Sequence, residues 1–176
     1  MLEGRRVRLA PLDVADITSD YVSWLNDPAT FEFLGSKFPQ TATSVRRYVE
    51  SVAPPNFLCR IIRQADDAHV GNIGMSGFST VNRRMELGIM IGDPSARGQG
   101  LGREACSLAV EHAFDHLNLH KVTAGTVVEN AGMTKVFQTL GFTIEGTLRE
   151  HYALRGGYRD YHVFGLLRNQ FVPCHR

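Results

Sequence analysis

The first third of the chain combines helical spacing of its apolar residues with short polar breaks. Over Asp13–Leu25 apolar side chains recur every three or four residues, so they share one face of a predicted helix. Pro28 follows and favours an end to that helix. A second helix is predicted to begin with Thr43 or Ser44, either of which can cap it, and to run through Val52.

From residue 57 the pattern changes to strands joined by turns at Asp66-Asp67 and Val81-Asn82. Two helices interrupt them. The first starts at Leu101 and carries the apolar stripe of a helix lying on a sheet. The second covers Met133–Leu140 and ends at Gly141, a residue suited to a left-handed cap. The predicted strands are Val7–Pro11, Phe57–Arg63, His69–Ser79, Arg84–Ile91, Lys121–Val127, Thr143–Ala153 and Tyr158–Leu167.

The order of these elements indicates the fold class. One strand, two helices, three strands, a helix, a strand, a helix and two strands predict an α+β fold, with helices packed on a mixed sheet. The 176 residues suffice for one domain with a sizeable core, so a single domain over residues 1–176 is expected.

Composition narrows the classes of function. Charged residues make up 21% of the chain and the net charge is +1, so no basic tract for nucleic acid is indicated. The three cysteines are widely spaced and form neither a disulfide framework nor a zinc pattern. No apolar run reaches about 18 residues, so no membrane span is predicted. Met1–Arg8 lacks the apolar core of a signal peptide, and a cytoplasmic location is expected.

The stretch Arg97-Gly98-Gln99-Gly100-Leu101-Gly102 stands between a predicted strand and a predicted helix. Its glycines let the backbone approach a ligand, and the helix start offers unpaired N–H groups to phosphate oxygens. A Walker A loop is excluded because neither Lys nor Ser or Thr follows Gly102. The dinucleotide-binding fingerprint requires Gly-x-Gly-x-x-Gly, which this spacing fits poorly. A turn without any ligand remains an alternative.

The same hexamer resembles the acetyl-coenzyme A pyrophosphate loop of the GNAT superfamily of N-acetyltransferases. Arg97, Gly100 and Gly102 occupy the positions of the family pattern Gln/Arg-x-x-Gly-x-Gly/Ala. The resemblance continues along almost the whole chain, because Asn130–Phe142 is similar to the family's second cofactor element. Four more segments resemble the branch of ribosomal-protein N-terminal (RimJ/RimL-type) acetyltransferases: Arg8–Leu12, Glu145–Glu150, Tyr158–Asp160 and Gly165–Arg168.

This resemblance implies the GNAT fold, a mostly antiparallel sheet flanked by helices. In that fold the fourth and fifth predicted strands, Arg84–Ile91 and Lys121–Val127, splay apart and the cofactor enters between them. It also implies acetyl-CoA as the cosubstrate and no metal. A backbone N–H near Ile91 would face the thioester carbonyl as an oxyanion hole. The residues implied to contact the cofactor are Met90, Ile91, Arg97, Gly98, Gln99, Gly100, Leu101, Gly102, Arg103, Asn130 and Phe137.

Several of these residues have a second interpretation. Asn130 can simply cap the following helix. Met90 and Ile91 can be ordinary core residues of a strand, which is compatible with cofactor binding through their backbone. Arg97 and Arg103 are expected to donate charge-assisted hydrogen bonds to phosphate.

Glu86 is the candidate general base, because the resemblance places a catalytic glutamate at the start of this strand. The alternative is a glutamate that only faces solvent. Phe137 departs from the family, since many members carry a Tyr there that protonates the leaving thiolate. A thiol has a pKa near 8.5, so a thiolate can leave without that acid.

The acceptor is implied to be a primary amine, on a protein N-terminus or an amino sugar. The resemblance assigns its recognition to the first two helices and the final hairpin, and the candidate acceptor-binding residues are Trp24, Phe31, Phe33 and Tyr152. Packing is the alternative for each of these aromatic rings. Two other classes of protein stay open: a module that senses acetyl-CoA without catalysis, and a Rossmann-type nucleotide enzyme. The sequence also leaves open whether the chain forms a homodimer.

Overall fold

The computed structural model describes residues 1–34, 38–154 and 156–174 of the chain, except for the side chain of Phe31. The described strands form one sheet in the order β1-β2-β3-β4-β5-β6-β8-β7. Their bounds are β1 (Leu2–Glu3), β2 (Val7–Pro11), β3 (Phe57–Arg63), β4 (Ala68–Ser79), β5 (Arg84–Ile91), β6 (Lys121–Val127), β7 (Thr143–Leu154) and β8 (Gly157–Leu167).

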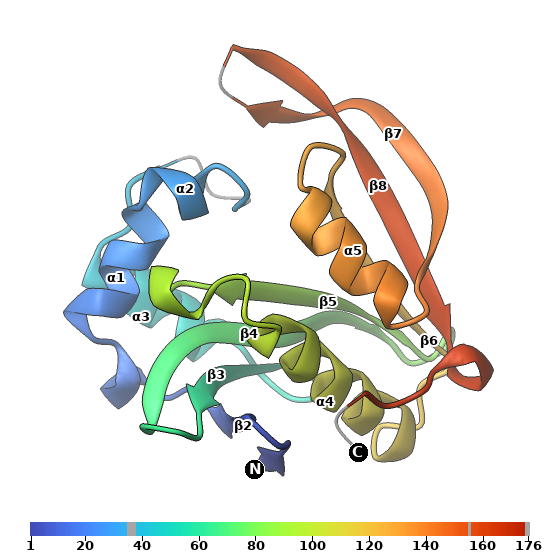
Figure 1. Cartoon of the computed structure of the whole chain (residues 1–176), viewed down its shortest axis with the longest axis horizontal. Coiled ribbons are helices and arrows are strands. Elements are labelled where there is room, and N and C mark those ends of the chain that lie inside the picture. Colours follow the sequence, from blue (N-terminus) through green and yellow to red (C-terminus); the bar gives the residue numbers. More distant parts are fainter. Residues whose placement is uncertain (35–37, 155, 175–176) are drawn as a thin grey trace.

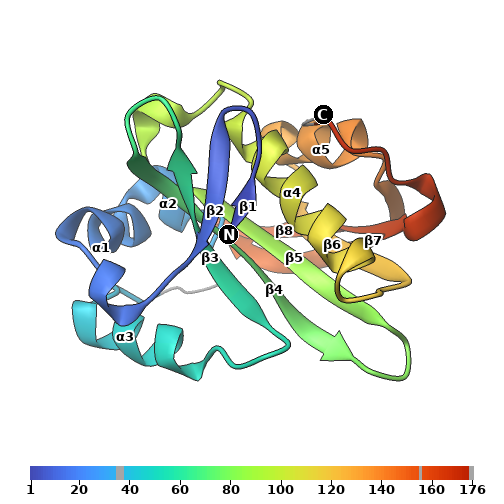
Figure 2. The ribbon, with the colours of Figure 1, turned by 90° about the horizontal axis from the view of Figure 1, so that it is seen from below.

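Helices cover both faces of this sheet (Figures 1 and 2). The α-helices are α1 (Ser19–Asn26), α2 (Pro28–Phe31), α3 (Ala42–Ser51), α4 (Leu101–Asp115) and α5 (Ala131–Thr139). The 3-10 turns are η1 (Val14–Asp16), η2 (Pro94–Ala96) and η3 (Arg168–Gln170). Seen from below, α1 and α3 lie on one side of the sheet, and α4 and α5 lie on the other (Figure 2).

The core is divided by the sheet into two clusters. The larger one lies under α4, whose residues Ala105, Ala109 and Ala113 are completely buried against the strands. The smaller one joins α1 and α3 through Tyr21, Val45 and other side chains. Each fully buried large apolar side chain contributes about 1.5–3 kcal/mol to stability. Successive strand residues point to opposite faces, so one sheet supplies both clusters.

Strand β5 loses one of its two neighbouring strands part-way along its length. β5 pairs with β4 as far as Ile91, but its parallel pairing with β6 ends at Leu87 and Ala124. Beyond that point β6 continues beside β8. The expected splay of these two strands is therefore confirmed, and the edge of β5 over Gly88–Ile91 has no strand beside it in the described chain.

Two predicted helices differ from the structure at their ends. The helix predicted over Asp13–Leu25 is divided in two: Asp13 and Asp16 form a capping box around η1, and Thr18 then caps a separate helix. The next helix is capped by Thr41 rather than by Thr43 or Ser44, because Thr41 accepts the N–H of Ser44 and Ser44 accepts the N–H of Thr41. The strand β1 and the single turn α2 were not predicted, since both are very short.

Trp24 packs on the backbone where β5 ends. A Cβ added to Gly92 would lie 2.2 Å from the Trp24 ring, so only glycine leaves room there. The same indole meets His69 edge-on, with 5.2 Å between the ring centroids. Burial lowers the pKa of His69, against the opposing effect of its hydrogen bonds to Asn72 and Gly71. Trp24 therefore helps to fix α1 on the sheet.

We expect Gly92→Ala to lower the free energy of unfolding by about 1–3 kcal/mol, because the new methyl group displaces the indole. Trp24 is the single tryptophan of the chain, so its fluorescence emission should shift to longer wavelength in the folded variant. Gly146→Ala is the matched control, since a Cβ there meets nothing within 4 Å. Equal denaturation midpoints for the two variants would contradict this account of the packing.

Candidate active site

The glycine-rich stretch forms a tight turn directly in front of α4. Gly98 and Gly100 have φ angles of 71° and 79°, a region that favours glycine, and Gly100 is the N-cap of the helix. Within the described chain, the N–H groups of Gly98, Gly100 and Gly102 have no hydrogen-bond acceptor. Unpaired donors at a helix start attract an anion. The residues present therefore fit the pyrophosphate of a nucleotide cofactor.

Arg97 has a different set of partners from those expected. Its guanidinium donates to the carbonyls of Ile91 (3.2 Å) and Gly92 (3.1 Å), and to Thr30 Oγ1 (2.7 Å). It also lies 3.4 Å from the carboxylate of Asp27. The pKa of Asp27 is lowered because its hydrogen bonds to Thr30, Ala29 and Arg97 outweigh its partial desolvation. Arg97 thus ties the end of β5 to the corner between α1 and α2.

A basic residue that sequence reasoning missed lies beside the loop. Arg6 Nη1 donates to the carbonyl of Gln99 at 2.7 Å, and it lies 3.9 Å from a Cβ built on Gly100. The buried carboxylate of Glu104 accepts the N–H groups of Arg6 (2.8 Å) and Val7 (3.3 Å), which fixes this N-terminal turn. Arg103 is exposed on the first turn of α4. Arg6 and Arg103 therefore place positive charge near the unpaired N–H groups.

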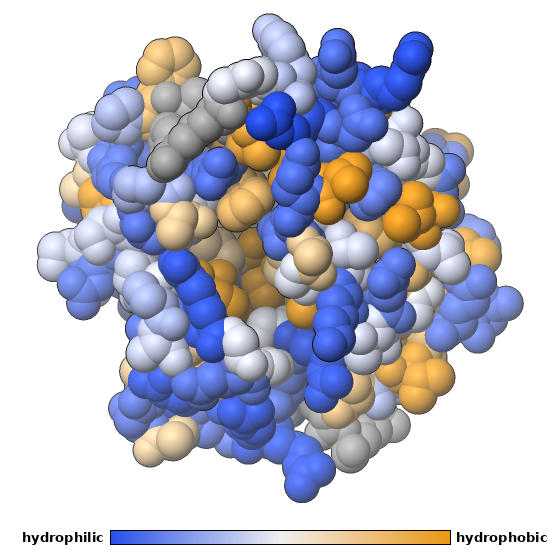
Figure 3. All heavy atoms as spheres, turned by 45° about the horizontal axis from the view of Figure 1, so that its top comes forward, coloured by the Kyte–Doolittle hydropathy of each residue, from blue (hydrophilic) through white to orange (hydrophobic). Residues whose placement is uncertain are grey.

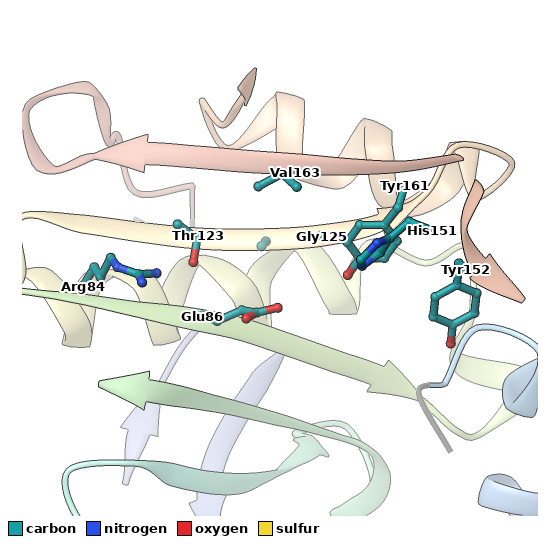
Figure 4. Close-up of a pocket in the computed structure, with 9 residues that line it drawn as sticks. Arg84, Glu86, Thr123, Gly125, His151, Tyr152, Tyr161 and Val163 are labelled. Carbon is teal, nitrogen blue, oxygen red and sulfur yellow. The ribbon is translucent and has the colours of Figure 1, made fainter. Parts of the chain in front are cut away.

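Glu86 lines a pocket on the face of the sheet opposite α4. The pocket has a volume of about 400 Å³ and is formed by β5, β6, β7 and β8. Figure 4 shows the carboxylate of Glu86 directed into the pocket. Figure 3, turned so that the top of Figure 1 comes forward, shows that the surface of the molecule is hollowed on that side. Glu86 pairs in register with Thr123, one residue before the β5–β6 pairing ends. The carboxylate therefore lies next to the point where the two strands separate.

Aromatic rings form the other wall of this pocket. Tyr161 lies over Gly125, where an added Cβ would be only 2.3 Å from its ring. The ring stacks on Tyr152, with 6.0 Å between centroids and 13° between planes, and lies 5.6 Å from His151. Burial raises the pKa of Tyr161, and the nearby Glu86 carboxylate adds to this effect. Sequence reasoning missed Tyr161, although a glycine within a β-branched strand is a signal of close approach.

The predicted acceptor residues divide between the pocket and its surroundings. Tyr152 lines the pocket and donates its hydroxyl to the carbonyl of Leu34, so the hairpin touches the segment after α2. Phe33 is 41% exposed. Trp24 packs against Gly92 and His69, as described above. Residues 35–37 of this segment lie outside the described chain, as does the side chain of Phe31.

The segment Asn130–Phe142, predicted to be a second cofactor element, is held in place by contacts within the protein. Asn130 caps α5 by accepting the N–H of Met133 at 3.1 Å, which is the structural role considered for it. Phe137 is 2% exposed, and its ring packs on Phe142 and Phe164 at centroid distances of 5.3 and 5.1 Å. Phe137 is therefore a core side chain in this structure. Whether either residue contacts a cofactor stays a prediction.

The described chain shows neither a metal-binding cluster nor a membrane-spanning helix. The described residues contain no group of three or more His, Cys, Asp or Glu side chains that could hold a metal ion. No described helix is long and apolar enough to cross a membrane.

Comparison with protein families decides which fold and chemistry the pocket at Glu86 and the loop before α4 serve. Residues 6–143 match the family model described as an acetyltransferase (GNAT) domain. The chain belongs to the GNAT acetyltransferase family. The GNAT fold implied by the resemblance along almost the whole chain is confirmed, and the chain is an acyltransferase by class.

Similar proteins span nearly the full length of this one. The spermidine N(1)-acetyltransferase of Escherichia coli (strain K12) is 26% identical over 181 residues, which cover 100% of this chain and 94% of that protein. The crystal structure of spermidine N-acetyltransferase from Vibrio cholerae in complex with CoA and spermine has a TM-score of 0.86 at 21% identity, covering 94% of this GNAT chain and 97% of the other. An acetyltransferase (GNAT family) from Bacillus anthracis has a TM-score of 0.80 at 18% identity, with coverages of 96% and 98%.

We expect Gly100→Val to weaken coenzyme A binding at least tenfold, measured by titration calorimetry, because the side chain fills the space in front of the unpaired N–H groups. Gly156→Val is the matched control. It carries the same backbone strain, with a φ of 77° against 79°, but lies at the tip of the β7–β8 hairpin. Unchanged affinity in a folded Gly100→Val protein would rule out the loop as the phosphate site.

Proposed function

We propose that this GNAT protein transfers the acetyl group of acetyl-CoA to a primary amine by direct attack of the amine on the thioester. The acceptor proposed is a protein N-terminus or an amino sugar, in line with the resemblance to RimJ/RimL-type enzymes. One observation carries the proposal: the carboxylate of Glu86 faces a pocket at the point where β5 and β6 separate. Donor and acceptor can meet there from opposite faces of the sheet.

On the donor side, the loop and the free strand edge would do the binding. The unpaired N–H groups at Gly98, Gly100 and Gly102 suit the pyrophosphate. Over Gly88–Ile91 the edge of β5 that faces away from β4 has no described strand beside it, so its backbone can pair with the amide-bearing pantetheine arm. A backbone N–H along this edge is available to stabilise the oxyanion that develops on the thioester carbonyl.

On the acceptor side, Glu86 would accept the proton of the attacking amine. An α-amine has a pKa near 8, so a sizeable fraction is already neutral at pH 7. A general base that removes the remaining proton typically contributes 10²-fold or more to the rate. The Tyr161 hydroxyl lines the same pocket and can hydrogen-bond the amine or an intervening water.

We expect Glu86→Gln to lower kcat by about 10²-fold while coenzyme A affinity stays within twofold, because the carboxylate lies on the acceptor side of the sheet. Thiol release over a panel of peptides, amino sugars and simple amines measures kcat, and calorimetry measures affinity. Glu3→Gln on β1 is the matched control. If no acceptor releases thiol despite tight coenzyme A binding, the chain is a sensor of acetyl-CoA and the proposal fails.

We expect Phe137→Tyr to change turnover less than tenfold, because a thiolate leaves readily without an acid and the Phe137 ring is enclosed by Phe142 and Phe164. The measurement is kcat with the best acceptor of the panel. A gain of several hundredfold would show that proton delivery to the leaving thiolate limits the wild-type enzyme.

A further inference from the structure

The pocket at Glu86 contains one fixed charge of each sign. Its lining residues are Arg84, Glu86, Thr123, Ala124, Gly125, His151, Tyr152, Tyr161 and Val163. Glu86 is the single carboxylate among them, and Arg84 is the single residue with a permanent positive charge. The two are separated by one residue on β5, so both point to the same face, with Cα atoms about 7 Å apart.

Neither of these two charged side chains forms an ion pair or a side-chain hydrogen bond within the described chain. The ion pairs and side-chain hydrogen bonds of the described chain include neither Arg84 nor Glu86. Figure 4 shows the carboxylate of Glu86 directed away from Arg84, towards Tyr161. The cross-strand neighbour of Arg84 is Lys121, whose ammonium is already paired with Glu145 at 2.6 Å. Arg84 thus presents its guanidinium at one end of the pocket and Glu86 its carboxylate nearer the other.

We infer that the acceptor is an amine with an anionic group, a carboxylate or a phosphate, a few bonds away from its amino group, and that Arg84 binds this group. This inference rests on the proposed function, because it assumes that the amine lies at Glu86. The guanidinium can hold a carboxylate or a phosphate with two parallel hydrogen bonds. Such a zwitterion satisfies both fixed charges at once, and a pocket of about 400 Å³ has room for a small molecule or a terminal residue.

The same arrangement disfavours a polyamine as the acceptor. A chain with two or three ammonium groups would place a second cation near the guanidinium of Arg84, with one carboxylate to balance it. Like charges at a site raise the free energy of binding. The inferred acceptor class therefore differs from the polyamine after which relatives such as spermidine N(1)-acetyltransferase are named.

The test compares acceptors of equal length that differ in one terminal group: 4-aminobutyrate, butylamine and 1,4-diaminobutane, with O-phosphoethanolamine as the phosphate case. Thiol release gives kcat and KM for each, and calorimetry with coenzyme A present gives their affinities independently of turnover. We expect the two anionic amines to have at least tenfold higher kcat/KM than butylamine, and the diamine to be the poorest acceptor. The better of the two anionic amines distinguishes a carboxylate from a phosphate.

Substitutions that change the charge at Arg84 test directly whether this residue binds the anionic group of the acceptor. We expect Arg84→Gln to raise the KM of the anionic amines at least tenfold while that of butylamine changes less than threefold, with kcat retained in both cases. Arg84→Glu should invert the order and favour the diamine. Arg47→Gln on α3, which also removes one exposed positive charge, is the matched control.

Two results would overturn the inference while leaving the proposed function intact. One is equal use of butylamine and 4-aminobutyrate by the wild type; the other is an Arg84→Gln variant that keeps the preference for anionic amines. Absence of thiol release with every amine would instead contradict the proposed function, and the calorimetric comparison of wild type with Arg84→Gln would then decide the role of Arg84.

Discussion

The end of the β5–β6 ladder at Leu87 and Ala124 is the constraint on which the site depends. Backbone N–H and C=O groups that are not paired within a sheet must find other partners or remain available to a ligand. Before this point the two strands hold Glu86 beside Thr123. After it, β5 offers a free edge to a ligand strand, and the loop with its unpaired N–H groups follows directly. The candidate general base Glu86, the free strand edge and the glycine loop thus follow one another along the chain.

The sheet separates the glycine loop from the pocket at Glu86, so the proposed donor and acceptor sites lie on opposite faces. α4 packs on one face through small residues, and its N-terminus brings the anion site to that side. α1 and α3 pack on the other face, where Glu86 and the aromatic wall also lie. Strand alternation makes this possible, since Leu87 points into the large core while Glu86 points into the pocket. In the proposed reaction the two substrates meet where β5 and β6 separate.

Local signals in the sequence predict the parts of this site that are contiguous. The strand Arg84–Ile91, the loop and the start of α4 agree with the structure because β-periodicity, glycine spacing and helix periodicity are all short-range patterns. The break at Ile17 was missed, since the apolar spacing continues through it while Asp13 and Thr18 cap two separate turns. Contacts of Arg97 with Thr30, and of Tyr161 with Gly125, join residues far apart in the chain. No local pattern encodes them, because they depend on how the strands are ordered.

Arg97 connects the proposed donor site at the glycine loop with the corner between α1 and α2, near the proposed acceptor site. Its guanidinium binds the end of β5, Thr30 and Asp27, while its own backbone continues into the loop before α4. Arg97 therefore links the loop to the corner between α1 and α2 through hydrogen bonds, which provide a route for coupling between ligands bound at the two places. Coupling of this kind is reciprocal, so the factor by which one ligand changes the affinity for the other is the same in both directions. A substitution that breaks these hydrogen bonds therefore changes the coupling equally for both ligands.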